Sequence, residues 1–140
     1  MKALKTLIRL QQWQLDQSRL ALAVATEELA AIQSTIQALD DEEATERQSA
    51  AQSETALFAF SGYAARLKER RAALHEQQAS AEQTVEETRE VVAETFREEK
   101  KLEQALQAKI DRANAEAARQ EQITLDEIAA AGHRRRHSEA

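Results

Sequence analysis

The amino-acid sequence predicts an all-α protein, a long two-helix antiparallel coiled-coil hairpin with a disordered basic C-terminal tail. The 140 residues include no proline and two glycines, so few residues interrupt a helix. Only 4% of the residues are aromatic, too few to fill a thick globular core. Apolar residues also recur every seven positions, the repeat of helices that wind around each other. A thin seam of aliphatic side chains must therefore hold the fold together.

The first helix is predicted over residues 3–60, because two interleaved series fill the a and d positions of a heptad repeat. One series is Ile8, Leu15, Leu22, Leu29 and Ile36, and the other is Leu4, Gln11, Ser18, Ala25, Ile32 and Leu39. The pattern continues through Glu43, Glu46, Ala50 and Ser53 to Leu57 and Phe60. Its polar members predict a weak patch in the seam.

Gly62 predicts a turn near residues 61–63, since one heptad series closes before it and another opens after it. The second helix is predicted over residues 64–131. Its seam comprises Leu67, Leu74, Ala81, Val85, Thr88, Val92, Thr95, Leu102 and Leu106, and then slips in phase to Ile110, Ala113, Ala117, Thr124 and Ile128.

Folding back at Gly62 places residue i opposite about residue 124 − i, which pairs Leu39 with Val85 and Leu22 with Leu102. Residues 1–131 are thus predicted to form a single antiparallel hairpin. Residues 132–140, which are rich in Arg and His, are predicted to be a disordered tail because no apolar residue docks them.

Composition and charge argue against several classes of protein. A net charge of −6 disfavours nucleic-acid binding, and the lack of cysteine excludes disulfides and thiolate metal sites. No stretch reaches the roughly 18 consecutive apolar residues of a membrane span, so no direct membrane insertion is expected. Arg9 and two glutamines soon interrupt the signal-like start, which favours a cytosolic protein.

No motif for catalysis, cofactor binding or metal binding is present. The sequence has no glycine-rich phosphate loop, and its many carboxylates are predicted to lie on an open helical surface without a cleft. His133 and His137 have a spacing that can chelate a metal on a helix, but three arginines separate them in the tail. We therefore predict a protein that is not an enzyme and that works by binding other proteins.

Apolar side chains of the first helix also lie outside the seam. Leu10, Trp13, Leu20 and Val24 fall at the c and f positions, with Arg9 and Arg19 beside them. An exposed apolar strip usually marks a partner site, and Trp with Arg is a frequent hot-spot pairing. Self-association, or a third helix supplied by the C-terminal end of the chain, would also cover this strip.

Aromatic residues gather near the predicted turn. Phe58, Phe60 and Tyr63 form a second candidate for partner binding. The alternative is that they form a plug that closes the end of the seam.

Four segments resemble the flagellar export stalk family, FliJ, and together they cover nearly the whole chain. They are Leu4-x-x-Leu7-Ile8-Arg9-Leu10-x-x-Trp13-x-Leu15-Asp16-x-x-Arg19-x-x-Leu22, Tyr63-Ala64-x-Arg66-Leu67, Phe96-Arg97-Glu98-Glu99-Lys100-Lys101-Leu102-Glu103 and Glu121-Gln122-x-x-Leu125-Asp126-Glu127-Ile128-Ala129. The chain departs from the family pattern where Gln11, Gln12, Gln14 and Gln17 replace charged residues.

The resemblance implies a non-catalytic stalk of the bacterial flagellar type III export apparatus, at the cytoplasmic face of the inner membrane. In this family the paired terminal ends sit in the pore of the hexameric export ATPase. The turn end reaches toward the cytoplasmic domain of the export gate, and some members also handle export chaperones.

Carried onto this chain, the ATPase end is Arg9, Leu10, Trp13, Arg19, Leu20 and Val24, and the gate end is Phe58, Phe60, Tyr63 and Leu67. Two alternatives stay open. One is the equivalent stalk of a virulence injectisome, and the other is a purely structural coiled-coil spacer or oligomerisation rod.

Overall fold

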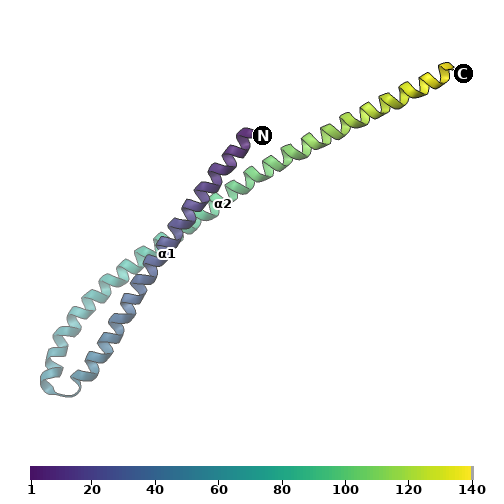
Figure 1. The fold of residues 1–140 in the computed structure, drawn as a ribbon. Helices are drawn as coiled ribbons and strands as arrows, with labels where there is room; N and C mark the ends of the chain where they lie inside the picture. The colour runs from purple at the N-terminus through teal and green to yellow at the C-terminus, as the bar shows by residue number, and fades with distance from the viewer. Residues whose placement is uncertain (140) are drawn as a thin grey trace. The chain divides into compact units, whose positions relative to one another are not determined.

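The computed structural model describes residues 1–139, which form two α-helices and contain no strand (Figure 1). Helix α1 spans Lys2–Ala50 and helix α2 spans Glu54–Glu139. The helices divide into two compact units. The hairpin unit is Trp13–Phe96, and the terminal unit is Met1–Gln12 together with the residues from Arg97 onward. The predicted all-α helical hairpin is confirmed.

Residues 51–53 connect the two helices, and local hydrogen bonds explain why the chain turns there. At the end of α1, the Gln52 N–H donates to the carbonyl of Ser49 at 3.2 Å. Ser53 then caps α2, because its hydroxyl accepts the N–H of Ala56 at 3.0 Å. Glu54 in the first turn places a negative charge at the positive end of the helix dipole.

The prediction of a turn near residues 61–63 is wrong, and with it the predicted helix bounds of 3–60 and 64–131. Gly62 lies inside α2, has no positive φ and leaves open space where a Cβ would stand. The residue therefore uses none of the conformational freedom that favours glycine at turns. The capping serine at residue 53 is the signal that starts the second helix.

Burial along α1 follows the predicted seam. The buried positions are Ile8, Leu15, Ser18, Ala25, Leu39 and Ala50, and the half-buried ones are Leu4, Gln11, Leu22, Leu29, Ile32, Ile36 and Glu43. The polar Ser18 is tolerated because its hydroxyl donates to the carbonyl of Leu15 at 2.8 Å. Glu46 is the exception, since it is exposed.

The seam of α2 is also where the sequence predicts it, from Leu67 to Leu106, but the register differs. In the hairpin unit, Arg71 contacts Asp40 and Glu43, and Arg47 lies over Phe60. In each of these facing pairs the two residue numbers add up to about 107–114, whereas a turn at Gly62 predicts about 124. Helix α2 is thus displaced along α1 by roughly two heptads from the predicted register. The predicted pairings, such as Leu39 with Val85, are wrong for this reason.

The C-terminal segment of α2, residues 111–139, has no helical partner. Its side chains are exposed throughout, apart from the half-buried Gly132, whereas Ile110 just before it is half-buried. Ala113, Ala117, Thr124 and Ile128, predicted to lie in the seam, are therefore exposed.

The tail that the sequence predicts to be disordered is helical as far as Glu139. Ala140, the last residue of that predicted tail, lies outside the described residues. Hydrogen bonds from the Arg136 Nε to the Gly132 carbonyl (3.3 Å) and from Ser138 to the Arg135 carbonyl (3.0 Å) accompany this last turn.

Two substitutions test where the turn lies. Gly62→Ala should raise the free energy of unfolding by about 1 kcal/mol, because alanine is the better residue inside a helix. Ser53→Ala should lower it by about 1 kcal/mol, because the N-cap is lost. Urea unfolding followed by circular dichroism measures both changes. A Gly62→Ala protein that is less stable than the parent would indicate that the turn lies at residues 61–63.

Candidate functional site

An exposed apolar strip runs along α1 in the hairpin unit. This Trp13 strip consists of Trp13, Leu20 and Val24, whose exposed fractions are 59%, 60% and 48%. Because the a and d positions of α1 face α2, residues at c and f turn away from the seam, as the sequence predicts. Arg19 is exposed on the same stretch of helix. In the terminal unit, the predicted Arg9 and Leu10 are exposed as well.

A shallow groove of about 430 Å³ lies next to the strip. It is lined by Gln17, Leu20, Ala21, Val24, Ala25 and Glu28 of α1 and by Thr84 and Thr88 of α2. The two threonine hydroxyls donate to the carbonyls of Ser80 (3.1 Å) and Thr84 (2.6 Å), so they are already satisfied. The groove can therefore receive apolar side chains without leaving these hydroxyls unpaired.

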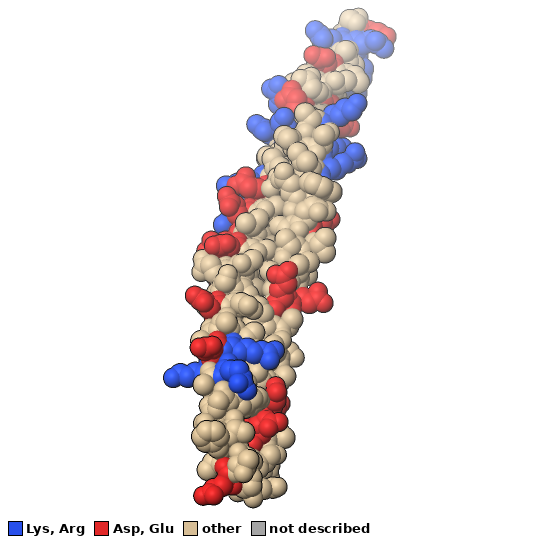
Figure 2. Space-filling view, turned by 90° about the vertical axis from the view of Figure 1, so that its left-hand side faces the viewer, with Lys and Arg blue, Asp and Glu red and all other residues tan. Residues whose placement is uncertain are grey.

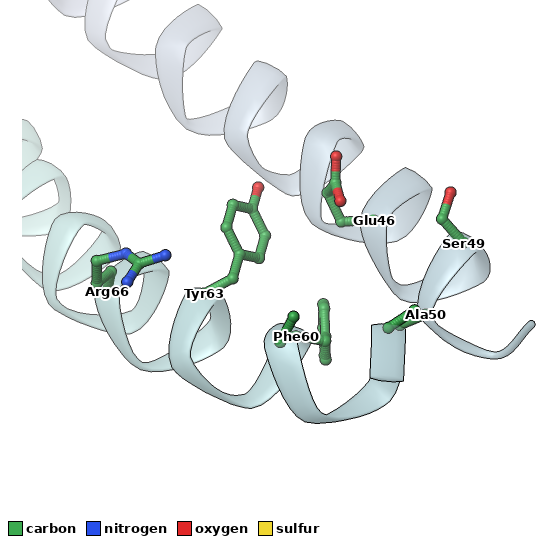
Figure 3. Close-up of a pocket in the computed structure, with 8 residues that line it drawn as sticks. Glu46, Ser49, Ala50, Phe60, Tyr63 and Arg66 are labelled. Carbon is green, nitrogen blue, oxygen red and sulfur yellow. The ribbon is translucent and has the colours of Figure 1, made fainter. Parts of the chain in front are cut away.

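A second pocket, of about 340 Å³, lies beside the turn in the hairpin unit (Figure 3). Figure 3 shows Tyr63 pointing from α2 toward α1 and Phe60 lying near Ala50. The ring centroids of Phe60 and Tyr63 are 6.0 Å apart, and the Arg47 guanidinium is 5.7 Å from the centroid of Phe60. Two rings with a cation over one of them hold this end of the hairpin together.

The Tyr63 hydroxyl oxygen is buried, and its interaction with Glu42 falls short of hydrogen-bond geometry. Burial is the main cause that raises the pKa of the Tyr63 phenol, and the neighbouring carboxylates of Glu42, Glu46 and Glu43 raise it further. A partner that supplied an acceptor at this pocket would complete the hydrogen bonding of this hydroxyl.

The four residues predicted for the gate end differ in accessibility. Phe58 is 84% exposed, and Phe60 and Tyr63 are half-buried. Leu67 is buried in the seam, so its side chain is not available to a partner. Leu57, which the sequence predicts in the seam, is instead 58% exposed in the first turn of α2 beside Phe58. Ser53 is the sequence signal that predicts this exposure, because a helix capped by Ser53 begins at Glu54 and places Leu57 in its first turn.

A polar layer joins the two helices of the hairpin unit. The Arg71 guanidinium pairs with Asp40 at 2.8 Å and with Glu43, which also pairs with Arg47 at 2.9 Å. The hydrogen bond from Arg71 is the main cause that holds the pKa of Glu43 below its usual range, and the same contact raises the pKa of Arg71. The sequence counts Glu43 as a weak point of the seam, yet here its charge is satisfied.

The face drawn in Figure 2 carries charges of both signs. On the face drawn in Figure 2, acidic and basic side chains alternate and broad uncharged areas lie between them. That pattern does not provide the continuous basic stretch that a phosphate backbone binds best. Within residues 1–139, no helix has an apolar stretch that would cross a bilayer.

Two histidines lie close together near the end of α2. His133 and His137 lie edge to face on α2, with ring centroids 4.4 Å apart. Residues 1–139 contain no group of three or more His, Cys, Asp or Glu side chains placed to hold a metal ion.

The chain matches a known protein family. The family model described as Flagellar FliJ protein matches residues 1–138. Neither a curated protein nor a solved structure matches the chain.

The polar layer predicts a specific response to acid. The pKa of Glu43 is lowered in the folded state, so its contribution to stability is full above the ordinary glutamate pKa and disappears as the pH falls through the lowered value. The parent should therefore lose melting temperature below about pH 4.5 more steeply than Arg71→Met does. Thermal melts followed by circular dichroism at each pH measure both slopes.

Arg89→Met is the matched control for this experiment, because Arg89 and Glu86 form an exposed 3.6 Å pair within one helix. Its melting temperature should fall with pH as steeply as that of the parent. Equal slopes for the parent and Arg71→Met would show that the polar layer adds nothing to stability.

Proposed function

Because this chain belongs to the FliJ family of flagellar proteins, we propose that it is the non-catalytic stalk of the flagellar type III export apparatus. Membership in the family makes it a flagellar export-related protein of a non-enzymatic family. The stalk role adds two binding partners, the hexameric export ATPase and the cytoplasmic domain of the export gate. It also adds a location, at the cytoplasmic face of the inner membrane.

The Trp13 strip is the observation that carries the proposal. Trp13, Leu20 and Val24 are each about half exposed or more, because two paired helices have no further core in which to bury them. An apolar strip of this kind, next to a groove whose threonine hydroxyls are hydrogen-bonded, is typical of a protein contact. We assign it, with Arg9, Leu10 and Arg19, to the export ATPase.

A helix pair that enters a six-fold ring cannot contact all six subunits in the same way. The subunit that meets the Trp13 strip differs from the subunit that meets the opposite face. Such asymmetric contacts would favour one nucleotide state at one position of the ring, which is how a stalk biases assembly and hydrolysis. The chain itself needs no catalytic group for this role.

The aromatic pocket beside the turn is assigned to the export gate. Phe58 is 84% exposed on α2, and the paired rings of Phe60 and Tyr63 line the pocket. Export chaperones are a further class of partner for this family, and the same apolar surfaces suit them. A pure spacer needs neither the strip nor the exposed aromatic ring.

Pull-down with the purified hexameric export ATPase tests the assignment. Trp13→Ala combined with Leu20→Ala should reduce capture by at least about tenfold, because a central aromatic and an aliphatic anchor are lost. Phe58→Ala is the matched control, and it should leave ATPase capture unchanged while it weakens capture of the gate domain.

Circular dichroism should confirm that all variants stay helical, since each of these residues is exposed in the parent. Full ATPase capture by the Trp13→Ala, Leu20→Ala protein would refute the stalk assignment and favour the structural spacer. The equivalent stalk of an injectisome would instead show capture of an injectisome ATPase in preference to the flagellar one.

A further inference from the structure

The C-terminal segment of α2 carries large apolar side chains that are exposed among the described residues. Leu125 and Ile128 are 53% and 63% exposed on this unpaired stretch of helix. Isolated helices are only marginally stable in water, and most gain stability by packing an apolar face. A face of this kind, on a helix that extends to Glu139, requires an occupant.

Charged residues frame that face symmetrically. Glu121 lies seven residues before Ile128 and Arg135 lies seven residues after it, so all three share one side of the helix. Leu125 and Ala131 stand three residues before and after Ile128. Neither Glu121 nor Arg135 forms an ion pair within residues 1–139. Along the chain, this face therefore carries an acidic residue, then apolar residues, then a basic residue.

We propose that this face binds the same face of a second copy, with the two α2 segments antiparallel around a two-fold axis near Ile128. In that arrangement, Glu121 of each copy meets Arg135 of the other, and the apolar residues pack between the two ion pairs. An isologous contact demands a surface that is complementary to itself, and a sequence that runs from acid to base around an apolar centre has this property. Ala131 and Gly132, which lie on the side of the helix that carries Ile128, let the helices approach closely.

The order of charges also selects the antiparallel orientation. A parallel pair would set Glu121 against Glu121 and Arg135 against Arg135, which is unfavourable at both ends. This contact goes beyond the stalk role, because it needs only the purified chain and no export ATPase. The free protein would then hold its C-terminal helices in a homodimer.

Sedimentation velocity of the full chain, at concentrations from about 1 to 100 µM, tests the proposal. The parent should shift from monomer to dimer, and the dimer should weaken with added salt because ion pairs contribute to it. Glu121→Arg alone and Arg135→Glu alone should each weaken dimerisation by about tenfold or more. An equimolar mixture of these two variants should dimerise like the parent, because each reversed charge then faces its opposite.

Two isoleucines of this segment provide a matched control. Ile128→Glu should abolish the dimer, whereas Ile123→Glu should not, because Ile123 is 40% exposed but lies on another side of the helix. Circular dichroism of both variants checks that they remain helical.

Three results would overturn the proposal. A parent that stays monomeric at 100 µM has no such contact. A mixture of charge variants that fails to dimerise excludes the reciprocal ion pairs. A dimer that survives Ile128→Glu but is lost in Trp13→Ala places self-association on α1. The last result would leave the contact with the export ATPase to be judged separately by the pull-down.

Discussion

The contact of Arg71 with Asp40 and Glu43 decides which residues of α1 face which residues of α2. The apolar seam alone cannot decide this, because a seam with a seven-residue repeat fits equally well after a shift of whole heptads. Partly exposed ion pairs contribute little to the free energy of folding. Their value here is selective, since a shift of two heptads would separate Arg71 from both carboxylates. The half-buried Glu43 would then keep only Arg47, on its own helix, as a cationic partner.

This register has consequences for the surfaces that remain open. Near the turn, it brings Phe60 under Arg47 and leaves Phe58 outside. In the middle of the hairpin unit, it sets Thr84 and Thr88 beside Leu20 and Val24, which forms the groove next to the Trp13 strip. At its far end, α2 has no partner beyond Ile110, and an apolar face flanked by Glu121 and Arg135 stays exposed. Each open surface thus follows from the pairing of α1 with α2.

Much of this could be predicted from the sequence, because heptad periodicity reports which side of a helix is buried. Leu15 and Val85 are buried, and Trp13 and Leu20 are exposed, as their heptad positions require. The turn could not be placed from Gly62, since a glycine is compatible with a helix interior, and the decisive signal was the cap at Ser53. The wrong turn then shifted the register by two heptads without disturbing the seam. Because the predicted register places Leu57 and the C-terminal part of α2 in the seam, the sequence does not predict that they are exposed.

The chain has no cysteine, so disulfide cross-linking can measure the register directly. Ala25 and Val85 are both buried, and Ala25 shares its groove with Thr84 and Thr88. The protein with Ala25→Cys and Val85→Cys should therefore form an intramolecular disulfide on mild oxidation, since cross-linking requires Cα atoms within about 4.4–6.8 Å. The protein with Leu39→Cys and Val85→Cys, the pair that a turn at Gly62 would bring together, should stay reduced. Cross-linking of the second pair and not of the first would contradict the register on which this account rests.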